Sequence, residues 1–233
     1  MTPIHGMPAS PPSSLSGTWP PRTAPMQLAL AVRTVDRWGL VAGVTGTLGN
    51  VLLAILFLTP ADGPYAWTGP ANDTIGIVAT LTMIPVAAGL LTVCGNRPGL
   101  GAMTSLAILA MVMIAAVSLL FVLGRAPFSA DVDSTYAGLV FIFGWLLAVG
   151  RAGRASGRLP RQVAGWGVAL GAAGLAGAVL LTASTLPPAG AALQHVAFAA
   201  GALAAGPVFA AYPVWLVVLS YRLPNHLAAP AST

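Results

Sequence analysis

The chain has 233 residues, of which 6% are charged and 57% are hydrophobic, and its formal net charge is +5. A soluble globular domain carries roughly 25% charged residues, so this chain has too few charges to cover a water-exposed surface. Together with a mean hydropathy of +0.85, the composition excludes a soluble protein and predicts an integral membrane protein.

Six apolar runs follow one another along the chain, at residues 38–58, 74–93, 100–123, 134–149, 163–186 and 192–221. Crossing ~30 Å of hydrocarbon takes about 20 helical residues, and continuous runs without alternation favour helices over barrel strands. The fourth run is short and is expected to extend into its flanks, whereas the sixth is long enough to tilt, kink or project. The sequence therefore predicts an all-α, six-helix transmembrane bundle over residues 38–223.

The flanking segments differ from the runs in composition. Residues 1–25 are rich in proline and polar residues, which predicts a disordered cytoplasmic tail, with a proline-rich ligand for a partner domain as the alternative. Residues 26–37 mix leucine and valine with charged residues and predict an amphipathic segment at the membrane interface. Residues 224–233 are expected to form a short cytoplasmic tail.

The distribution of charge predicts the orientation of the bundle. Four arginines lie close together between the fourth and fifth runs, without a nearby carboxylate: Arg151, Arg154, Arg158 and Arg161. We interpret residues 151–161 as a loop, and short arginine-rich loops stay cytoplasmic. Five further arginines fall on the same side: Arg22, Arg33, Arg37, Arg97 and Arg222. The opposite side receives Arg125 and four aspartates, Asp62, Asp73, Asp131 and Asp133. Both termini are thus predicted to be cytoplasmic.

The same distribution bears on partners and source. The pI of 10.4 invites a nucleic-acid partner, but basic residues gathered on one side of the runs are better explained by membrane sidedness. We therefore expect a lipid bilayer as the environment and no nucleic acid as a partner. The basic residues are all arginine, and arginine with alanine, glycine and proline but no lysine is the coding signature of a GC-rich genome. This bias favours a bacterial, actinobacterial inner-membrane protein.

Familiar catalytic motifs are missing from the chain. Without glutamate or lysine it has no HExxH motif and no Walker A lysine, and it has no G-x-S-x-G elbow. The single cysteine, Cys94, excludes an internal disulfide and a multi-cysteine metal site. We therefore expect neither an enzyme nor a bound metal or cofactor.

Small residues at helical spacing indicate where helices approach closely, because lipid competes with larger apolar side chains. Three runs carry them: Gly39, Gly43, Gly46 and Gly49; Gly167, Gly171, Gly174 and Gly177; and Ala197, Gly201 and Ala205. The first, fifth and sixth spans are therefore expected to form the tightly packed centre. Pro85, Pro207 and Pro213 predict kinks, which either form a gate or fit the helices to their neighbours.

Few polar side chains occur inside the runs, and these are the candidate functional residues. Asn50 shares a helical face with small residues and is expected to bond across a helix interface or to line a transport path. His195, beside Gln194, could relay a proton or sense external pH, or could rest at the headgroup level. Ser and Thr in the spans, such as Ser118, are expected to bond carbonyls of their own helix. Tryptophans near run ends, among them Trp215, are expected at the membrane interface.

The stretch from Gly206-Pro207-Val208 to Pro213-Val214-Trp215-Leu216 and on to Tyr221-Arg222-Leu223 resembles the last span of uncharacterised small polytopic membrane proteins of actinobacteria. The resemblance implies a membrane-spanning last helix. It implies no activity, so no functional residue follows from it.

Two functions remain as hypotheses. The first is a non-enzymatic protein that acts through partners, as an accessory subunit or a self-associating scaffold, because small-residue faces are abundant and buried ionisable groups are scarce. The second is a small transporter or permease component with a polar path near Asn50 and His195. The lack of a clear repeat between residues 38–123 and 134–221 weakens the second hypothesis.

Overall fold

The computed structural model describes residues 24–59, 63–65, 67–95, 97–185 and 190–228. Over these residues the chain forms six helices and no strand: α1 (Ala24–Leu58), α2 (Thr68–Cys94), α3 (Pro98–Val122), α4 (Phe128–Ser156), α5 (Arg161–Thr185) and α6 (Ala191–Ala228). All six are long and apolar enough to cross a membrane. The predicted all-α, six-helix fold is therefore confirmed. Most of the expected tail at 1–25 lies outside the described residues, as do Arg22 and Asp62.

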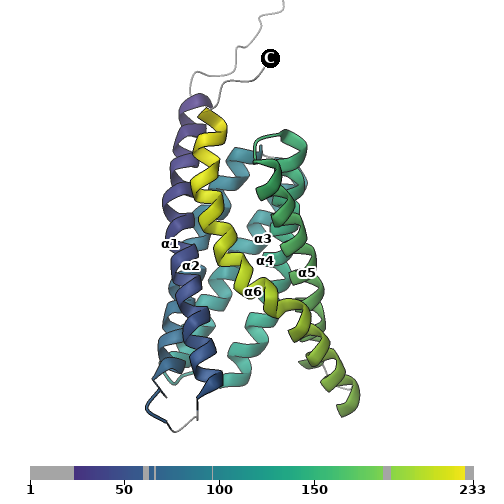
Figure 1. Cartoon of the computed structure of the whole chain (residues 1–233). Coiled ribbons are helices and arrows are strands. Elements are labelled where there is room, and N and C mark those ends of the chain that lie inside the picture. Colours follow the sequence, from purple (N-terminus) through teal and green to yellow (C-terminus); the bar gives the residue numbers. More distant parts are fainter. Residues whose placement is uncertain (1–23, 60–62, 66, 96, 186–189, 229–233) are drawn as a thin grey trace, which may run out of the picture.

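The six helices form a closed bundle (Figure 1). Each helix packs against its neighbours in sequence, α6 returns to pack against α1, and α2 also touches α4 across the interior. The largest side chains in the core are Trp145, Trp215 and Phe143, all with less than 3% of their surface exposed. Trp215 is thus a core residue that packs between helices and does not face lipid.

Charged residues divide the bundle into two ends. The start of α1 and the end of α6 lie together (Figure 1), at what we term the arginine end. Up-and-down connectivity places eight arginines toward this end: Arg33, Arg37, Arg97, Arg151, Arg154, Arg158, Arg161 and Arg222. The opposite, or aspartate, end carries Asp73, Asp131, Asp133 and Arg125.

Residues 151–161 do not form the predicted loop. Helix α4 continues to Ser156, and only residues 157–160 connect it to α5. The helix ends at Gly157, whose φ of 66° lies in the left-handed region that glycine adopts without strain. Leu159 then folds back, with its N–H donating to the Gly153 carbonyl (3.4 Å) and its side chain buried. Arg151 and Arg154 are therefore helical residues.

The other end of α4 begins at Phe128, so the short fourth run extends into its flanks, as expected. Asp131 and Asp133 therefore lie in the first two turns of the helix, where the helix dipole favours negative charge. The Ser118 hydroxyl donates to Asp131 Oδ1 (2.6 Å), which joins α3 to α4. The expectation that Ser118 bonds its own helix is wrong, although Thr82 and Thr104 do so.

Residues 26–37 belong to the same continuous helix as the first span. Ala31 and Val35 are buried in the core. A Cβ added at Gly89 of α2 would lie 2.7 Å from Val35 Cγ2, so α1 and α2 approach closely here. The segment is thus packed along α2 as part of the bundle.

The glycine stripes lie at helix–helix contacts, as predicted. A Cβ at Gly43 of α1 would lie 2.8 Å from the Pro213 carbonyl oxygen of α6, and one at Gly177 of α5 would lie 2.8 Å from the Ala205 nitrogen of α6. Gly171 and Gly174 of α5 face α4, and Gly167 lies between Trp215 of α6 and Gly150 of α4. Within the described residues α1 and α5 do not touch, because α6 lies between them. The expectation that the first, fifth and sixth spans form one packed centre is therefore wrong for the pair α1 and α5.

Helix α6 has 38 residues and stays helical through Pro207, Pro213 and Pro224. At the arginine end it runs beside α1, and toward the aspartate end it leans away with α5 (Figure 1). Helices α1 and α6 therefore diverge on the aspartate side of Pro213, and this divergence leaves space between them inside the bundle.

Candidate functional site

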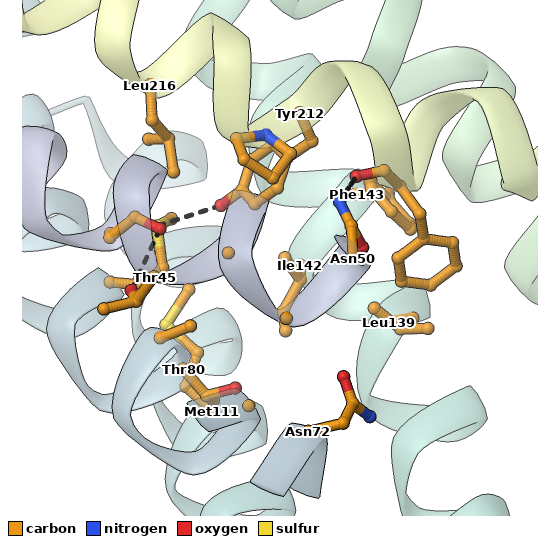
Figure 2. A pocket seen from close by; sticks show the side chains of 18 residues that line it. Thr45, Asn50, Asn72, Thr80, Met111, Leu139, Ile142, Phe143, Tyr212 and Leu216 are labelled. Carbon is orange, nitrogen blue, oxygen red and sulfur yellow. Dashed lines mark hydrogen bonds between the residues drawn. The ribbon is translucent and has the colours of Figure 1, made fainter. Parts of the chain in front are cut away.

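A cavity of about 200 Å³ lies between the helices, from mid-bundle toward the aspartate end (Figure 2). Helices α1, α2, α3, α4 and α6 all line it, and α5 does not. Most of the wall is apolar, including Met111, Leu139, Ile142 and Leu216. The polar side chains in the wall come from α1, α2 and α6: Thr45, Asn50, Asn72, Thr80 and Tyr212.

Asn50 joins α1 to α6 at the edge of this cavity. Its Nδ2 donates to the carbonyl oxygen of Phe209 at 2.6 Å (Figure 2). In an α-helix the carbonyl of residue 209 accepts from the N–H of residue 213, and Pro213 has no N–H. The side chain of Asn50 thus replaces the backbone N–H donor that Pro213 lacks. Of the two roles considered for Asn50, the structure shows the interhelical bond, at a position that also lines a cavity.

Aromatic side chains of α4 and α6 form one wall. The ring of Phe143 meets those of Phe209 and Tyr212 edge to face, with centroids 6.0 and 6.3 Å apart. The Tyr212 hydroxyl donates to the Met83 sulfur of α2 at 3.0 Å. These contacts tie α2, α4 and α6 together around the cavity, so this wall is held by packing on several sides.

Asn72 supplies the second amide of the cavity, from the second turn of α2. Its Oδ1 lies beside Gly49 of α1, where an added Cβ would make an ordinary contact at 3.6 Å. Asn72 Nδ2 also approaches Asp73 Oδ1 at 3.5 Å. The two asparagines therefore bring amide groups from two different helices to a mainly apolar space.

His195 and Gln194 lie elsewhere. They line a groove between α4, α5 and α6 together with Tyr136 and Phe198, and this groove shares no lining residue with the cavity. His195 is exposed, and its Nδ1 lies 2.7 Å from the Ala191 carbonyl of its own helix. The structure thus does not bring Asn50 and His195 together into one polar path.

The four arginines of the α4–α5 connection also lie apart from the cavity. All four are exposed, and Arg158 Nη1 donates to the Val93 carbonyl at the end of α2 (3.1 Å). Among the described residues, no group of three or more His, Cys, Asp or Glu side chains could hold a metal ion.

Sequence reasoning missed several lining residues. Asn72 was assigned to a loop, because the second span was expected to begin at residue 74. Nothing in the sequence distinguished Tyr212 and Phe209 from the other residues of the long apolar run at 192–221. The spacing between Phe209 and Pro213 is the one available clue, since a proline four residues later releases a carbonyl.

No family model, curated protein or solved structure matches this chain. Function is therefore inferred from the cavity and from the exposed helix faces alone.

Proposed function

We propose that the protein is a non-enzymatic, multi-pass membrane protein that binds a small, mainly apolar molecule carrying a hydrogen-bonding group. The observation that carries this proposal is the cavity between the helices. Its wall is mainly apolar and carries the polar side chains of Asn50, Asn72 and Tyr212. Ligand sites are typically concave and apolar, with a few placed polar groups, and span about 300–1,000 Å³. At about 200 Å³, this cavity suits a compact molecule.

The position of the cavity supports a role for binding in transport. It lies at the depth of the apolar runs, where the ligand would leave lipid or water and meet the amides of two helices. One wall is the seam where α1 and α6 separate, and Asn50 bridges that seam by one hydrogen bond. A side chain that bridges two helices and lines a cavity is suited to a permease component or a membrane receptor.

The test uses the purified protein in mild detergent, with benzyl alcohol and benzamide as probes and toluene as the matched hydrocarbon. Gly76→Leu should fill the cavity, because Gly76 lines it and a Cβ there meets no described atom within 4 Å. Ala116→Leu is the control, on the exposed surface of α3. The polar probes should raise the unfolding temperature of the wild type and of A116L more than toluene does, and G76L should lose this effect. Equal stabilisation of G76L and A116L would rule out the cavity as the site.

We infer a second candidate function, assembly with a partner subunit or a second copy, from an exposed stripe on α6. Ala202, Gly206 and Ala210 recur every four residues and are exposed, and a Cβ at Gly206 meets no described atom within 4 Å. Small residues at this spacing let membrane helices pack closely. The neighbouring Gly201 and Ala205 are buried against α5, so the outward stripe is the one left for a partner.

Gentle extraction followed by native mass spectrometry tests the assembly. A second polypeptide or a second copy at fixed ratio is expected, and Ala202→Leu should release it whereas Ala116→Leu should not. A monomer in the wild type, under conditions that preserve a known membrane dimer, would contradict this candidate.

We further propose that the protein lies in a bacterial inner membrane, of an actinobacterium, with the arginine end in the cytoplasm. The excess of arginine at one end supports the orientation, and the use of arginine without lysine supports the source. In a Cys94→Ala background, Ser129→Cys at the aspartate end should react with an impermeant maleimide in spheroplasts. Ala155→Cys at the arginine end should react only after permeabilisation. The reverse labelling pattern would show that the aspartate end is cytoplasmic and would contradict the proposed orientation.

A further inference from the structure

A second concavity runs along the outer surface between α1 and α2 and ends at the arginine end. Its first part, about 360 Å³, lies between Leu30 and Thr34 of α1 and Ala88 and Gly89 of α2. Its second part, about 350 Å³, reaches Arg158. Gln27 and Thr92 line both parts, so the two form one groove. We term it the α1–α2 groove, and it shares no lining residue with the central cavity.

The first part of the groove suits a hydrocarbon chain. Gly89 lies in its floor, where the missing side chain lets α2 pack directly against Val35 and Ala31 of α1. The hydroxyls of Thr34 and Thr92 donate to carbonyls of their own helices, Leu30 (2.9 Å) and Ala88 (3.3 Å). Their hydrogen-bonding capacity is thereby largely used within the helix. What the groove offers along this stretch is mainly aliphatic surface.

The second part of the groove suits an anion. Arg158 Nη1 donates to the carbonyl of Val93 (3.1 Å), one of the last carbonyls of α2, which the helix leaves without a partner. This bond holds the guanidinium at the groove and uses one of its five N–H donors. The remaining donors retain the planar geometry that binds phosphate at two points.

The surrounding charge reinforces this preference. Arg97 and Arg158 both act electrostatically on Cys94 at the end of α2, so the two cations lie in the same neighbourhood. Among the described residues assigned to the arginine end, Asp36 is the only carboxylate. An anion at Arg158 would therefore meet little repulsion.

We propose that the α1–α2 groove binds an anionic phospholipid, with its phosphate on Arg158 and one acyl chain along α1 and α2. The order of surfaces along the groove, aliphatic within the bundle and cationic at its end, is the order of chain and headgroup in a leaflet. From Pro25 to Thr34 the groove follows ten residues of α1, or about 13 Å of helix, which accommodates part of an acyl chain. This site is independent of the cavity ligand and of the partner on α6.

The test is native mass spectrometry of the delipidated full chain, with dioleoyl phosphatidylglycerol against dioleoyl phosphatidylcholine. The anionic lipid should bind at least tenfold more tightly. Arg158→Gln should abolish that preference, and Arg154→Gln should retain it, because Arg154 is exposed at the same end but does not line the groove. Ala88→Phe should weaken binding by obstructing the chain while leaving every arginine in place, which keeps the test valid if R158Q does not fold.

Several outcomes would overturn the assignment. Equal losses in R154Q and R158Q would show diffuse attraction without a site. Glycerol 3-phosphate that binds as tightly as the lipid, with no effect of A88F, would show an anion site without a chain. Lipid binding that appears only after removal of residues 1–23 would assign the groove to the N-terminal segment of the chain.

Discussion

The two halves of α6 are both apolar, yet one is packed and the other is exposed. From Pro213 to Leu223, α6 is buried against the glycines of α1 and against α5. From Ala191 to Phe209 it packs against α5 and reaches α1 and α4 through Phe209. In this half Leu193, Val196 and Leu203 are 63%, 65% and 80% exposed. Hydrophobicity does not separate the two halves, because lipid and protein are equally apolar. Small residues and hydrogen-bond partners decide which half packs.

The boundary between the two halves coincides with the wall of the cavity. Phe209 and Pro213 line the cavity, and the carbonyl of Phe209 is the one that Asn50 binds. From this point toward the aspartate end α1 and α6 separate (Figure 1). The cavity thus lies where the close packing between these two helices stops.

The largest expected effect comes from placing a leucine on each side of this boundary. Gly43→Leu should destabilise the protein by about 3 kcal/mol, because its Cβ would lie 2.8 Å from the Pro213 carbonyl oxygen, which cannot move alone. Gly206→Leu should cost less than about 1 kcal/mol, because no described atom lies within 4 Å of the added Cβ. Most of that cost should come from weaker binding of a partner at this face. Unfolding by SDS in mixed micelles measures both. Similar costs for the two variants would remove the distinction between the halves.

A smaller difference is expected between two buried tryptophans. Trp215 Nε1 donates to the Val163 carbonyl of α5 (2.8 Å), whereas Trp145 Nε1 is buried and finds no partner among the described residues. Replacing either by phenylalanine removes the same atoms. Trp215→Phe should therefore cost about 1 kcal/mol more than Trp145→Phe in the same unfolding assay, because only it breaks a hydrogen bond. A larger cost for W145F would mean that its indole N–H has a partner such as a buried water.

Loss of the hydrogen bond between Asn50 and the Phe209 carbonyl should lower the unfolding free energy modestly, and the size of this effect should depend on Pro213. Asn50→Leu should cost about 0.6 kcal/mol, the average for a hydrogen bond between membrane helices. Pro213→Ala restores the backbone N–H that can bind the Phe209 carbonyl, so Asn50→Leu should cost less in that background. A double-mutant cycle isolates this coupling from the packing that P213A loses against Gly46. Additive costs would show that Asn50 does not compensate for the proline.

The smallest effect is expected at His195, in the exposed half of α6. Its ring bonds a carbonyl of its own helix and lies outside the cavity. His195→Ala should change the unfolding free energy by less than about 0.5 kcal/mol, and should leave probe binding in the cavity unchanged. A loss of probe binding in H195A would support the hypothesis that His195 and Asn50 belong to one polar path.

The misassigned segments have local physical causes. The loop predicted at residues 151–161 is mostly helix, since a helix continues through arginines until a residue such as Gly157 adopts a positive φ. Asp131 and Asp133 fall outside the apolar run at 134–149, although the start of a helix favours such charges. The burial of Trp215, by contrast, is not a local property, because its Nε1–H donates to the Val163 carbonyl of α5, 52 residues away in sequence.

The sequence by itself determined the number of helices, their approximate limits and the separation of arginine from aspartate. Each of these depends on properties of single segments: the length of an apolar run and the charge of the residues between runs. It also identified the glycines of α1 and α5 as contact positions and Asn50 as a residue that needs a partner.

Only the tertiary structure decided which faces meet. In lipid, an inward-facing leucine and an outward-facing leucine are equally favourable, so the pattern of apolar residues does not mark the interior. The pairing of Asn50 with the carbonyl released by Pro213, the approach of Asn72, and the outward stripe at Ala202, Gly206 and Ala210 depend on how α6 crosses between α1 and α5. That crossing is set by contacts between segments far apart in the chain, which no local pattern contains.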